Sequence, residues 1–177
     1  MTRLDFTWAL DRPDLLAAPV HRALAALPPA LSTQVRVAPI DGDLADTAAF
    51  CAAYQVPLEI SANCIVVAGR RAGVTTHAAC VILATTRADV NGTIRRLLGA
   101  RRASFAGMDE AVALTGMEYG GITPIGLPDG WPVLVDSRVA QVPEAIVGAG
   151  IRGAKLAIPG PVLAALPNVD VIESLAT

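Results

Sequence analysis

The segment EYGGITPIGLP, residues 118–128, combines three glycines and two prolines with apolar residues and a single carboxylate at its edge. Glycine lets the backbone adopt conformations and close approaches that a side chain forbids, whereas proline fixes φ and removes an amide donor. Neither a helix nor a strand accommodates this mixture. The segment therefore predicts a rigid loop, nearly free of side chains, deep within the chain.

Apolar periodicity on both sides of this loop predicts helices and strands in mixed order. Helices are expected at 19–27, at 46–54 and 89–99 with Asp46 and Asp89 as N-caps, and at 109–116 and 160–167. The stripe of the third helix consists of Val90, Ile94, Leu97 and Leu98. Apolar runs predict strands at 34–40, 64–69, 79–86, 131–135, 144–150 and 154–158. Because this order is not a regular βαβ alternation, we expect an α+β fold with a curled mixed sheet.

Length and hydropathy indicate one domain spanning residues 1–177. A chain of 177 residues can bury roughly two thirds of its unfolded surface in one core, and this chain shows no repeat or linker. The hydrophobic fraction is 53%, but no run reaches the ~18 apolar residues of a membrane span. No basic segment leads into an apolar N-terminus, so no signal peptide is expected. These features favour a cytoplasmic protein without membrane contact.

The cysteines and histidines do not support a metal site or a catalytic triad of nucleophile, histidine and carboxylate. Cys51, Cys64 and Cys80 are an odd number without paired spacing, so we expect buried free thiols in a reducing compartment. His77 and Cys80 have the spacing of a ligand pair, but a zinc site needs three or four ligands. Neither His21 nor His77 has obvious nucleophile and carboxylate companions. No metal or cofactor is therefore predicted.

Charge is segregated along the chain, although the formal net charge is only −2. Residues 60–108 contain seven arginines against Asp89 alone, a net charge of +6, while the segments on either side are acidic. Such a basic segment can dock nucleic-acid phosphates, or it can be a solvated face that aids solubility. Aromatic residues do not alternate with the arginines, which gives no support to base stacking. The nucleic-acid candidates are Arg70, Arg71, Arg95, Arg96, Arg101 and Arg102.

The order of three segments resembles a known family. ADVNGTIRRLLGARRASFAGMDEAVALTGMEYGGITPIGLP, then PVLVD, then IVGAGIRGAKLAI is similar to the YbaK/ProX family of aminoacyl-tRNA editing domains, over roughly residues 40–175. The resemblance implies a mixed, barrel-like curled β-sheet flanked by helices. It also implies a trans-acting deacylase that hydrolyses mischarged aminoacyl-tRNA. On this reading residues 1–40 are an N-terminal helix and strand extension, and residues 41–177 are the editing domain.

The resemblance assigns the glycine-rich loop to the aminoacyl pocket. Its G-x-x-x-P segment comprises Gly120, Gly121, Ile122, Thr123 and Pro124, and a second glycine turn contains Gly148 and Gly150. An aminoacyl ester is already activated, so its hydrolysis needs backbone donors where the carbonyl oxygen becomes negative more than it needs a strong nucleophile. A small pocket would exclude larger amino acids by clash. Candidate walls are Ile122, Met117 and Leu127, the last two of which can equally be ordinary core residues.

The chain departs from the family pattern at the start of the first core strand and in the segment VGAGIRGAK, where the serine and the aspartate that the family often has are both missing. Asn63, followed by Cys64, occupies the start of the first core strand, where members of the family usually have lysine. Lys155, the only lysine of the chain, lies where they often have aspartate, while Gly150, Arg152 and Gly153 match. We hypothesise that the cation has moved across the pocket, so that Lys155 contacts the terminal phosphate of the tRNA or the substrate. A surface lysine on a strand edge is the simpler alternative.

Two classes of function therefore stay open. The first is an active hydrolase that clears a small mischarged amino acid, with Asn63, Cys64, Met117, Arg152 and Lys155 contacting the substrate. The second is a catalytically degenerate module that binds tRNA or an aminoacyl-tRNA synthetase. An open cavity with unpaired N–H groups would favour the hydrolase. Binding of an unrelated small molecule on the same scaffold is a third possibility.

Overall fold

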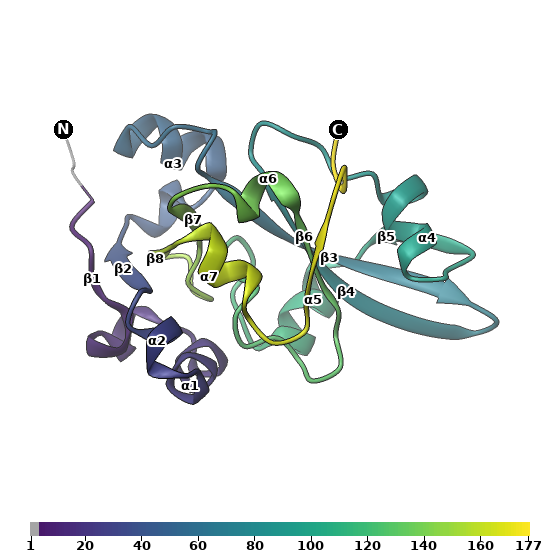
Figure 1. Ribbon diagram of the computed structural model, residues 1–177, viewed down its shortest axis with the longest axis horizontal. Coiled ribbons are helices and arrows are strands. Elements are labelled where there is room, and N and C mark those ends of the chain that lie inside the picture. Colours follow the sequence, from purple (N-terminus) through teal and green to yellow (C-terminus); the bar gives the residue numbers. More distant parts are fainter. Residues whose placement is uncertain (1–3) are drawn as a thin grey trace.

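The computed structural model describes residues 4–177, which form two β-sheets with helices packed around them (Figure 1). One sheet has four strands in the order β1-β2-β8-β7 and the other has five in the order β5-β3-β4-β6-β9. The first contains β1 (Thr7–Trp8), β2 (Arg36–Pro39), β7 (Ala145–Gly148) and β8 (Ala154–Ile158). The second contains β3 (Ala62–Arg71), β4 (Val74–Leu83), β5 (Arg102–Phe105), β6 (Val133–Asp136) and β9 (Val169–Ile172).

The two sheets meet at the start of β3. Ser61 forms an isolated parallel bridge with Ile146 of β7, and the Ile146 amide donates to the Ile60 carbonyl over 2.8 Å. The chain thus passes from one sheet into the other without a closed ring of strands. The expected α+β fold with a curled mixed sheet flanked by helices is confirmed, in an open form.

Residues 4–40 form the outer part of the four-stranded sheet and the helices beside it, at the left of Figure 1. The helix predicted after Pro19 is confirmed, because Val20 and Leu24 on its inner face are buried. Residues 1–3 of the predicted extension lie outside the described part. The helical elements here are η1 (Ala9–Asp11), η2 (Pro13–Leu15), α1 (Ala18–Ala26) and α2 (Pro29–Ser32).

The long β3–β4 hairpin projects away from these N-terminal elements (Figure 1). The residues predicted as a connection are mostly strand, and the turn is only Ala72 and Gly73, both with positive φ. Arginine and threonine side chains at the tip are exposed, which explains why apolar patterning ended the strands too early. β5 pairs with β3 from Val67 to Arg70 and was not predicted.

Side-chain caps set the starts of two predicted helices. Asp46 accepts hydrogen bonds from the Ala48 and Ala49 amides and opens α3 (Thr47–Tyr54), after the short η3 (Gly42–Leu44). Asp89 accepts from the amides of Gly92 and Thr93 and opens a π-helical turn, η4 (Val90–Ile94), which leads into α4 (Arg95–Leu97). The wider π-helical turn rotates the following residues relative to a regular α-helix. Leu97, predicted to lie on the buried apolar face, is therefore 44% exposed.

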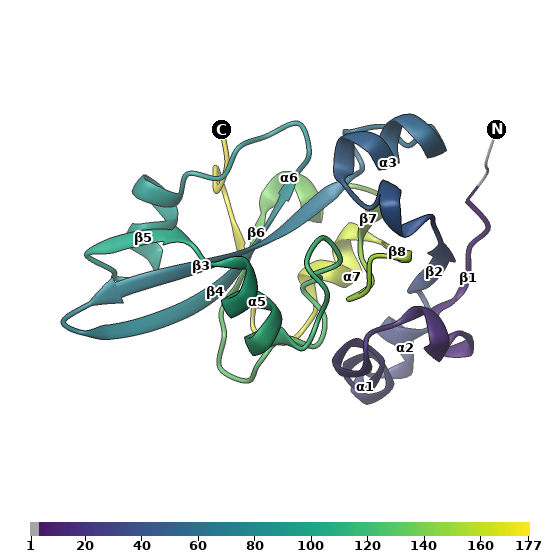
Figure 2. The same ribbon diagram turned by 180° about the vertical axis from the view of Figure 1, so that it is seen from behind.

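The remaining predicted helices follow glycine and proline signals, whereas residues 137–140 form a helix that was not predicted and that the Asp136 side chain caps. α5 (Met108–Thr115) ends at Gly116, whose φ of 65° is the left-handed C-cap conformation. Figure 2 shows α5 lying over β3 and β4. In the C-terminal half, α6 (Ser137–Ala140) follows β6 and α7 (Gly160–Ala164) follows β8.

The largest buried cluster lies between the helices and both sheets, and includes Val81, Val135, Val147 and Leu156. A smaller cluster lies on the other face of the five-stranded sheet, around Val67, Cys80 and Ile94. Cys51 and Cys80 are buried free thiols as predicted, whereas Cys64 is only partly buried. Within residues 4–177, no helix combines the length and hydropathy needed to cross a bilayer.

Candidate active site

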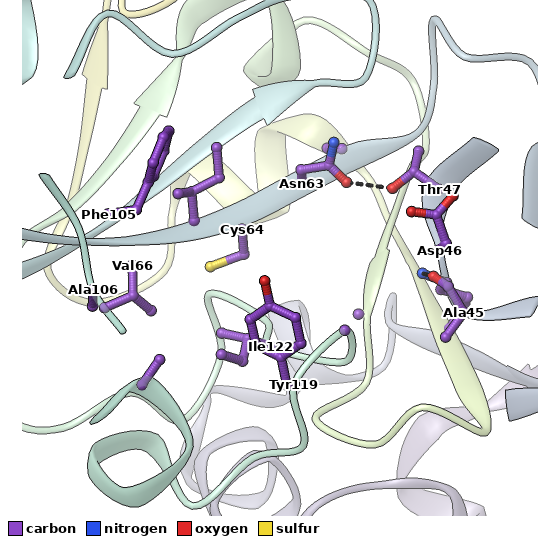
Figure 3. Close-up of a pocket in the computed structure, with 16 residues that line it drawn as sticks. Ala45, Asp46, Thr47, Asn63, Cys64, Val66, Phe105, Ala106, Tyr119 and Ile122 are labelled. Atoms are coloured by element: carbon purple, nitrogen blue, oxygen red, sulfur yellow. Dashed lines mark hydrogen bonds between the residues drawn. The ribbon is translucent and has the colours of Figure 1, made fainter. Parts of the chain in front are cut away.

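A cavity of about 310 Å³ opens where the end of β7, the start of β3 and the glycine-rich loop come together (Figure 3). Its walls are contributed by segments far apart in the sequence, including α3, β3, β5, α5 and β8. Small and apolar side chains predominate. The lining residues are Ala45, Asp46, Thr47, Ala62, Asn63, Cys64, Ile65, Val66, Phe105, Ala106, Ala111, Tyr119, Gly120, Ile122, Gly148 and Lys155.

The first glycines of the loop are required by its conformation and packing. Gly120 has φ of +87°, where a side chain is strained. A Cβ on Gly121 would lie 2.5 Å from the Ile151 carbonyl carbon. The Gly121 amide donates to the Glu118 carbonyl over 2.9 Å, which closes a tight turn. The loop is therefore held by backbone contacts on both sides.

The second glycine turn packs directly against the first. A Cβ on Gly148 would overlap the carbonyl oxygen of Gly121, and a Cβ on Gly150 would overlap the side chain of Ala17. The Gly150 amide donates to the Gly121 carbonyl over 2.7 Å. Gly148 lines the cavity and Gly150 does not, so Gly150 supports the loop from behind.

The other loop and wall residues predicted from the sequence do not all face the cavity: some lie on the opposite side of the loop. Ile122 lines the cavity, whereas Met117 is 2% exposed within the main core. Pro124 and Leu127 line a second, more apolar cavity of about 220 Å³, together with Trp131 and residues of α1. Thr123 is fully buried between them and its hydroxyl has no hydrogen-bond partner within residues 4–177.

The polar wall of the cavity contains both departures from the family pattern. Asn63 accepts a 2.6 Å hydrogen bond from the Thr47 hydroxyl, which orients its amide beside the cap of α3. Lys155 is 8% exposed, and its Nζ donates to the Ala45 carbonyl over 3.1 Å and lies 4.9 Å from the centroid of the Phe50 ring. Lys155 is thus a buried cavity residue, and the alternative of a surface lysine is excluded.

Burial lowers the pKa of the Lys155 ammonium below its ordinary value of 10.5. Cys51 and Asp46 oppose that shift, and the positive charge of Arg152 adds to it. The carbonyl of Ala45 and the face of Phe50 partly replace the lost water. The chain therefore maintains a poorly hydrated cation against the cavity, which will interact strongly with any negative charge formed there.

Arg152, only three residues earlier, has a different environment. Its backbone amide donates to the Glu118 carboxylate over 2.6 Å, and its guanidinium donates to the carbonyls of Tyr119 and Gly42 over 3.3 and 2.9 Å. Arg152 does not line the cavity. These contacts join the glycine-rich loop to η3, so the structure places Arg152 as a clamp on the loop.

Cys64 and two aromatic residues complete the cavity. Burial raises the pKa of the Cys64 thiol well above its ordinary value, with a smaller contribution from Cys80, so the thiol stays neutral. Tyr119 extends toward Cys64 from the loop, and Phe105 lies beyond β3 at the end of β5 (Figure 3). Both aromatic residues are more than half exposed. Neither was selected from the sequence, although Tyr119 directly precedes the glycines of the loop.

Neither histidine lines the cavity. His77 Nε2 lies 2.9 Å from Glu110 Oε1, and the imidazole stacks on Trp131 with ring centroids 5.1 Å apart. The hydrogen bond to His77 is the main cause of a lowered pKa for Glu110. This pair joins β4 to α5, whose Ala111 forms one wall of the cavity. Within residues 4–177, no three His, Cys, Asp or Glu side chains are grouped so as to hold a metal ion.

Four of the candidate arginines form an arginine cluster around the hairpin tip. The side chains of Arg70, Arg71, Arg101 and Arg102 line a shallow depression beside Gly73, and all are exposed. Arg95 and Arg96 lie on α4, where they contact the Asn91 carbonyl and the Thr93 hydroxyl. The cluster and the cavity are connected by β5, which begins at Arg102 and ends at Phe105.

Comparisons with known proteins place this geometry in a family. A comparison with curated protein sequences finds no significant match. Among solved structures, a hypothetical protein is 23% identical, with a TM-score of 0.72 over 84% of this chain and 95% of its own. The structure named "a putative trans-editing enzyme for prolyl tRNA synthetase" is 22% identical, with a TM-score of 0.73 over 89% of this chain and 97% of its own. These likenesses show the fold.

The family itself is identified at the level of sequence. The model of the aminoacyl-tRNA editing domain matches residues 41–166, which is well over half of the chain. That span contains β3, both glycine turns, Asn63 and Lys155. The chain therefore belongs to the aminoacyl-tRNA editing domain family, as the resemblance to YbaK-type domains implied.

Proposed function

We propose that this protein is a trans-acting aminoacyl-tRNA deacylase that removes a small mischarged amino acid. The observation that carries the proposal is the open cavity of about 310 Å³ between the glycine-rich loop and β3, with a buried cation in its wall. The replaced residues Asn63 and Lys155 line this cavity without filling it. An open cavity supports the hydrolase over the degenerate binding module.

In the proposed reaction a water oxygen attacks the carbonyl carbon of the ester. The carbon–oxygen bond to the terminal ribose then breaks, and the proton of the water passes to the leaving ribose oxygen. Negative charge develops on the carbonyl oxygen, so the loop must present donors there. The amides of Gly120 and Ile122 have no hydrogen-bond acceptor in the part of the chain that the structure describes, and both residues line the cavity.

Lys155 supplies the electrostatic part of this proposal. Its buried ammonium contacts the substrate at its reactive end, where a poorly hydrated cation stabilises the developing oxyanion. Asn63, held by Thr47, offers a neutral hydrogen bond across the cavity. The burial of Lys155 favours contact with the substrate over contact with an exposed tRNA phosphate.

The walls of the cavity favour a small amino acid. Ala62, Ala106, Ala111 and Ile122 give the cavity apolar walls, which suit a small apolar side chain. Steric exclusion rejects amino acids that are too large. Among smaller amino acids, a difference of one methylene changes the transition-state binding free energy by only about 1–3 kcal/mol. We therefore expect a strong upper size limit and weak discrimination below it.

The arginine cluster completes the proposal as the docking surface for tRNA. Arg102 and Phe105 are three residue steps apart on β5, which is about 10 Å at ~3.3 Å per step. Phosphates just before the 3′ end of a tRNA can therefore contact the cluster while the aminoacyl group enters the cavity. Residues 1–40 are proposed as an extension built into the same single domain, because β2 pairs with β8.

A deacylation panel tests the proposal. Purified protein is mixed with correctly charged and mischarged tRNAs, and the loss of aminoacyl ester is followed for the wild type and for Gly120→Ala, Asn63→Ala and Lys155→Ala. Hydrolysis of one small mischarged amino acid, lost in Gly120→Ala, is the expected result. Binding of tRNA or a synthetase without hydrolysis of any substrate would identify a binding module instead.

A further inference from the structure

We propose that the free edge of β3 at Cys64 binds the aminoacyl group as if that group were one residue of an antiparallel strand. In this arrangement the Cys64 carbonyl accepts from the substrate α-ammonium and the Cys64 amide donates to the ester carbonyl. The inference rests on the proposed function, since it describes how the same cavity holds its substrate.

The edge of β3 that faces away from β4 is covered at both ends and open in the middle. At one end β7 covers it, through the bridge between Ser61 and Ile146. At the other end β5 covers it, and the last contact is the Ala106 amide donating to the Val66 carbonyl over 2.9 Å. Cys64 lies in the gap between these two covered stretches.

The backbone groups of Cys64 point into that gap. Along β3, the carbonyls of Val66 and Arg70 accept from the β5 side, so even-numbered residues of this strand face β5. The pairing of β4 leads to the same conclusion. The Ala79 amide donates to the Pro132 carbonyl, so the backbone N–H and C=O groups of odd-numbered β4 residues point toward β6 and not toward β3. The pair Cys64 and Val81 is accordingly one without mutual hydrogen bonds.

On this edge, β5 pairs with β3 only from Val67 to Arg70 and the bridge to β7 is at Ser61, so in the described residues no strand partner is paired opposite Cys64. The cavity occupies the place of the absent strand, with Gly148 at the end of β7 on one side and Phe105 and Ala106 at the end of β5 on the other. Unpaired backbone groups that line a cavity are costly unless a ligand or water binds them. The gap can therefore bind a short ligand that has one hydrogen-bond acceptor for the Cys64 amide and one donor for the Cys64 carbonyl.

An aminoacyl ester carries that pair of groups. In a closely spaced antiparallel pair, two residues exchange both N–H···O bonds with their Cα atoms about 5.5 Å apart. The α-ammonium and carbonyl of the substrate have the same relative positions as the N–H and C=O of a residue. Recognition of this kind requires an α-amino acid and is indifferent to its side chain.

The direction of β3 also orients the substrate. The amide of Cys64 lies toward Asn63 and the carbonyl lies toward Ile65, so the ester carbonyl is directed to the end of the cavity near Gly148 and Lys155. The α-ammonium is directed to the opposite end, near Ala106, away from the Lys155 ammonium. The strand pairing thus agrees with the charge distribution of the cavity.

The pairing places the substrate side chain on the same face as the Cys64 side chain. That face carries Tyr119 and Ile122, toward which the Cys64 thiol points in Figure 3. Cys64 and Ile122 are then the residues that set the size limit. The neutral Cys64 thiol contributes as an apolar wall.

Proline substitution separates the backbone of Cys64 from its side chain. Proline removes an amide donor and is tolerated on an edge strand where that amide is unpaired. We expect Cys64→Pro to remain folded and to lose at least about 10-fold more in kcat/KM than Cys64→Ala, which alters the cavity wall but keeps the backbone amide. Ile65→Pro is the matched control, since the Ile65 amide faces β4 and its loss should unfold the protein. Unfolding of Cys64→Pro as severe as that of Ile65→Pro would overturn the assignment of the free edge.

Substrate variants test whether the Cys64 carbonyl binds the α-ammonium group. Alanyl and propionyl esters of the same tRNA differ only in the α-ammonium, so we expect kcat/KM to fall at least about 10-fold for propionyl-tRNA. Equal hydrolysis of the two esters would overturn the pairing while leaving the proposed deacylase intact.

Binding without hydrolysis is measured with the amide analogue of alanyl-adenosine. NMR should show the Cys64 amide shifting and its hydrogen exchange slowing when the analogue is added. This measurement does not depend on activity, so it decides the pairing even if the deacylation panel shows no hydrolysis. A shift at Gly120 without a shift at Cys64 would overturn it.

Discussion

The cavity and the arginine cluster both present positive charge, but in opposite physical settings. In the cavity one ammonium, that of Lys155, is 8% exposed and contacts a carbonyl and an aromatic face. In the cluster, four guanidinium groups lie in solvent around a hairpin turn. Water and salt screen the second region and reach the first poorly.

The difference suggests separate roles for the two regions: binding for the arginine cluster and hydrolysis for the cavity. Exposed arginines attract phosphates over several ångströms without distinguishing one tRNA from another. A buried cation acts only on what enters the cavity, and it acts strongly because its own burial leaves it poorly screened by water. We therefore expect changes in the cavity to affect the rate of hydrolysis and changes in the cluster to affect binding.

The largest effect should come from Gly148→Ala. The added Cβ would overlap the Gly121 carbonyl, so the two glycine turns must separate. We expect at least about 100-fold loss of kcat/KM, with about 1–3 kcal/mol loss in the free energy of unfolding. Gly153→Ala is the control, because its new Cβ has nothing closer than the Ile40 carbonyl oxygen at 4.0 Å. Equal activity of the two variants would show that turn packing does not shape the site.

Lys155→Met should follow, with about 10–100-fold loss in kcat and little change in KM. The methionine retains the volume of the side chain and removes the buried charge, so stability should be unchanged or higher. Arg152→Met is the contrasting variant, because it breaks the clamp to Gly42 and Tyr119 and should lower the melting temperature. A Lys155→Met protein with the wild-type kcat would remove Lys155 from the mechanism.

The double variant Arg70→Gln/Arg102→Gln should have a moderate effect, confined to tRNA binding. We expect the dependence of log Kd on log salt concentration to decrease by about one for each arginine that contacts a phosphate. Hydrolysis of alanyl-adenosine, which has no preceding phosphates, should stay at the wild-type rate. Arg12→Gln is the control, since Arg12 pairs with Asp14 in the N-terminal part. A reduced rate on alanyl-adenosine would contradict the division between the two regions.

The smallest effect is a pH dependence of stability. Because burial lowers the pKa of Lys155 in the folded state, the unfolded chain binds more protons between that pKa and 10.5. The free energy of unfolding should therefore gain a contribution from Lys155 as pH rises through this window and lose it as pH falls. Urea unfolding of the wild type and Lys155→Met at several pH values isolates the contribution by difference. An identical pH dependence in both would mean that Lys155 is solvated in solution.

Much of the scaffold could be predicted from local patterns. The Asp46 cap and the left-handed Gly116 appear in the structure because both depend on the backbone within a few residues. Patterns failed for β1, β5 and β9. These strands are two to four residues long, and each lies at an edge of its sheet, where one neighbour determines the pairing.

The candidate site was predictable only in part. Gly120, Gly148, Asn63 and Lys155 were selected from the sequence and lie together around the cavity. Met117 and Pro124 were selected with them, yet Met117 lies in the core and Pro124 on the far side of the loop. Sequence proximity does not reveal the direction of a side chain in an irregular loop, because no period relates neighbouring residues there.

The sequence by itself determined the family, the α+β class and the two glycine turns, since each depends on residue types at short spacing. Only the tertiary structure decided that Lys155 is buried against the cavity and that the edge of β3 is open at Cys64. The physical reason is that burial and strand pairing depend on neighbours more than 80 residues away, such as Ala45 for Lys155 and Ile146 for Ser61.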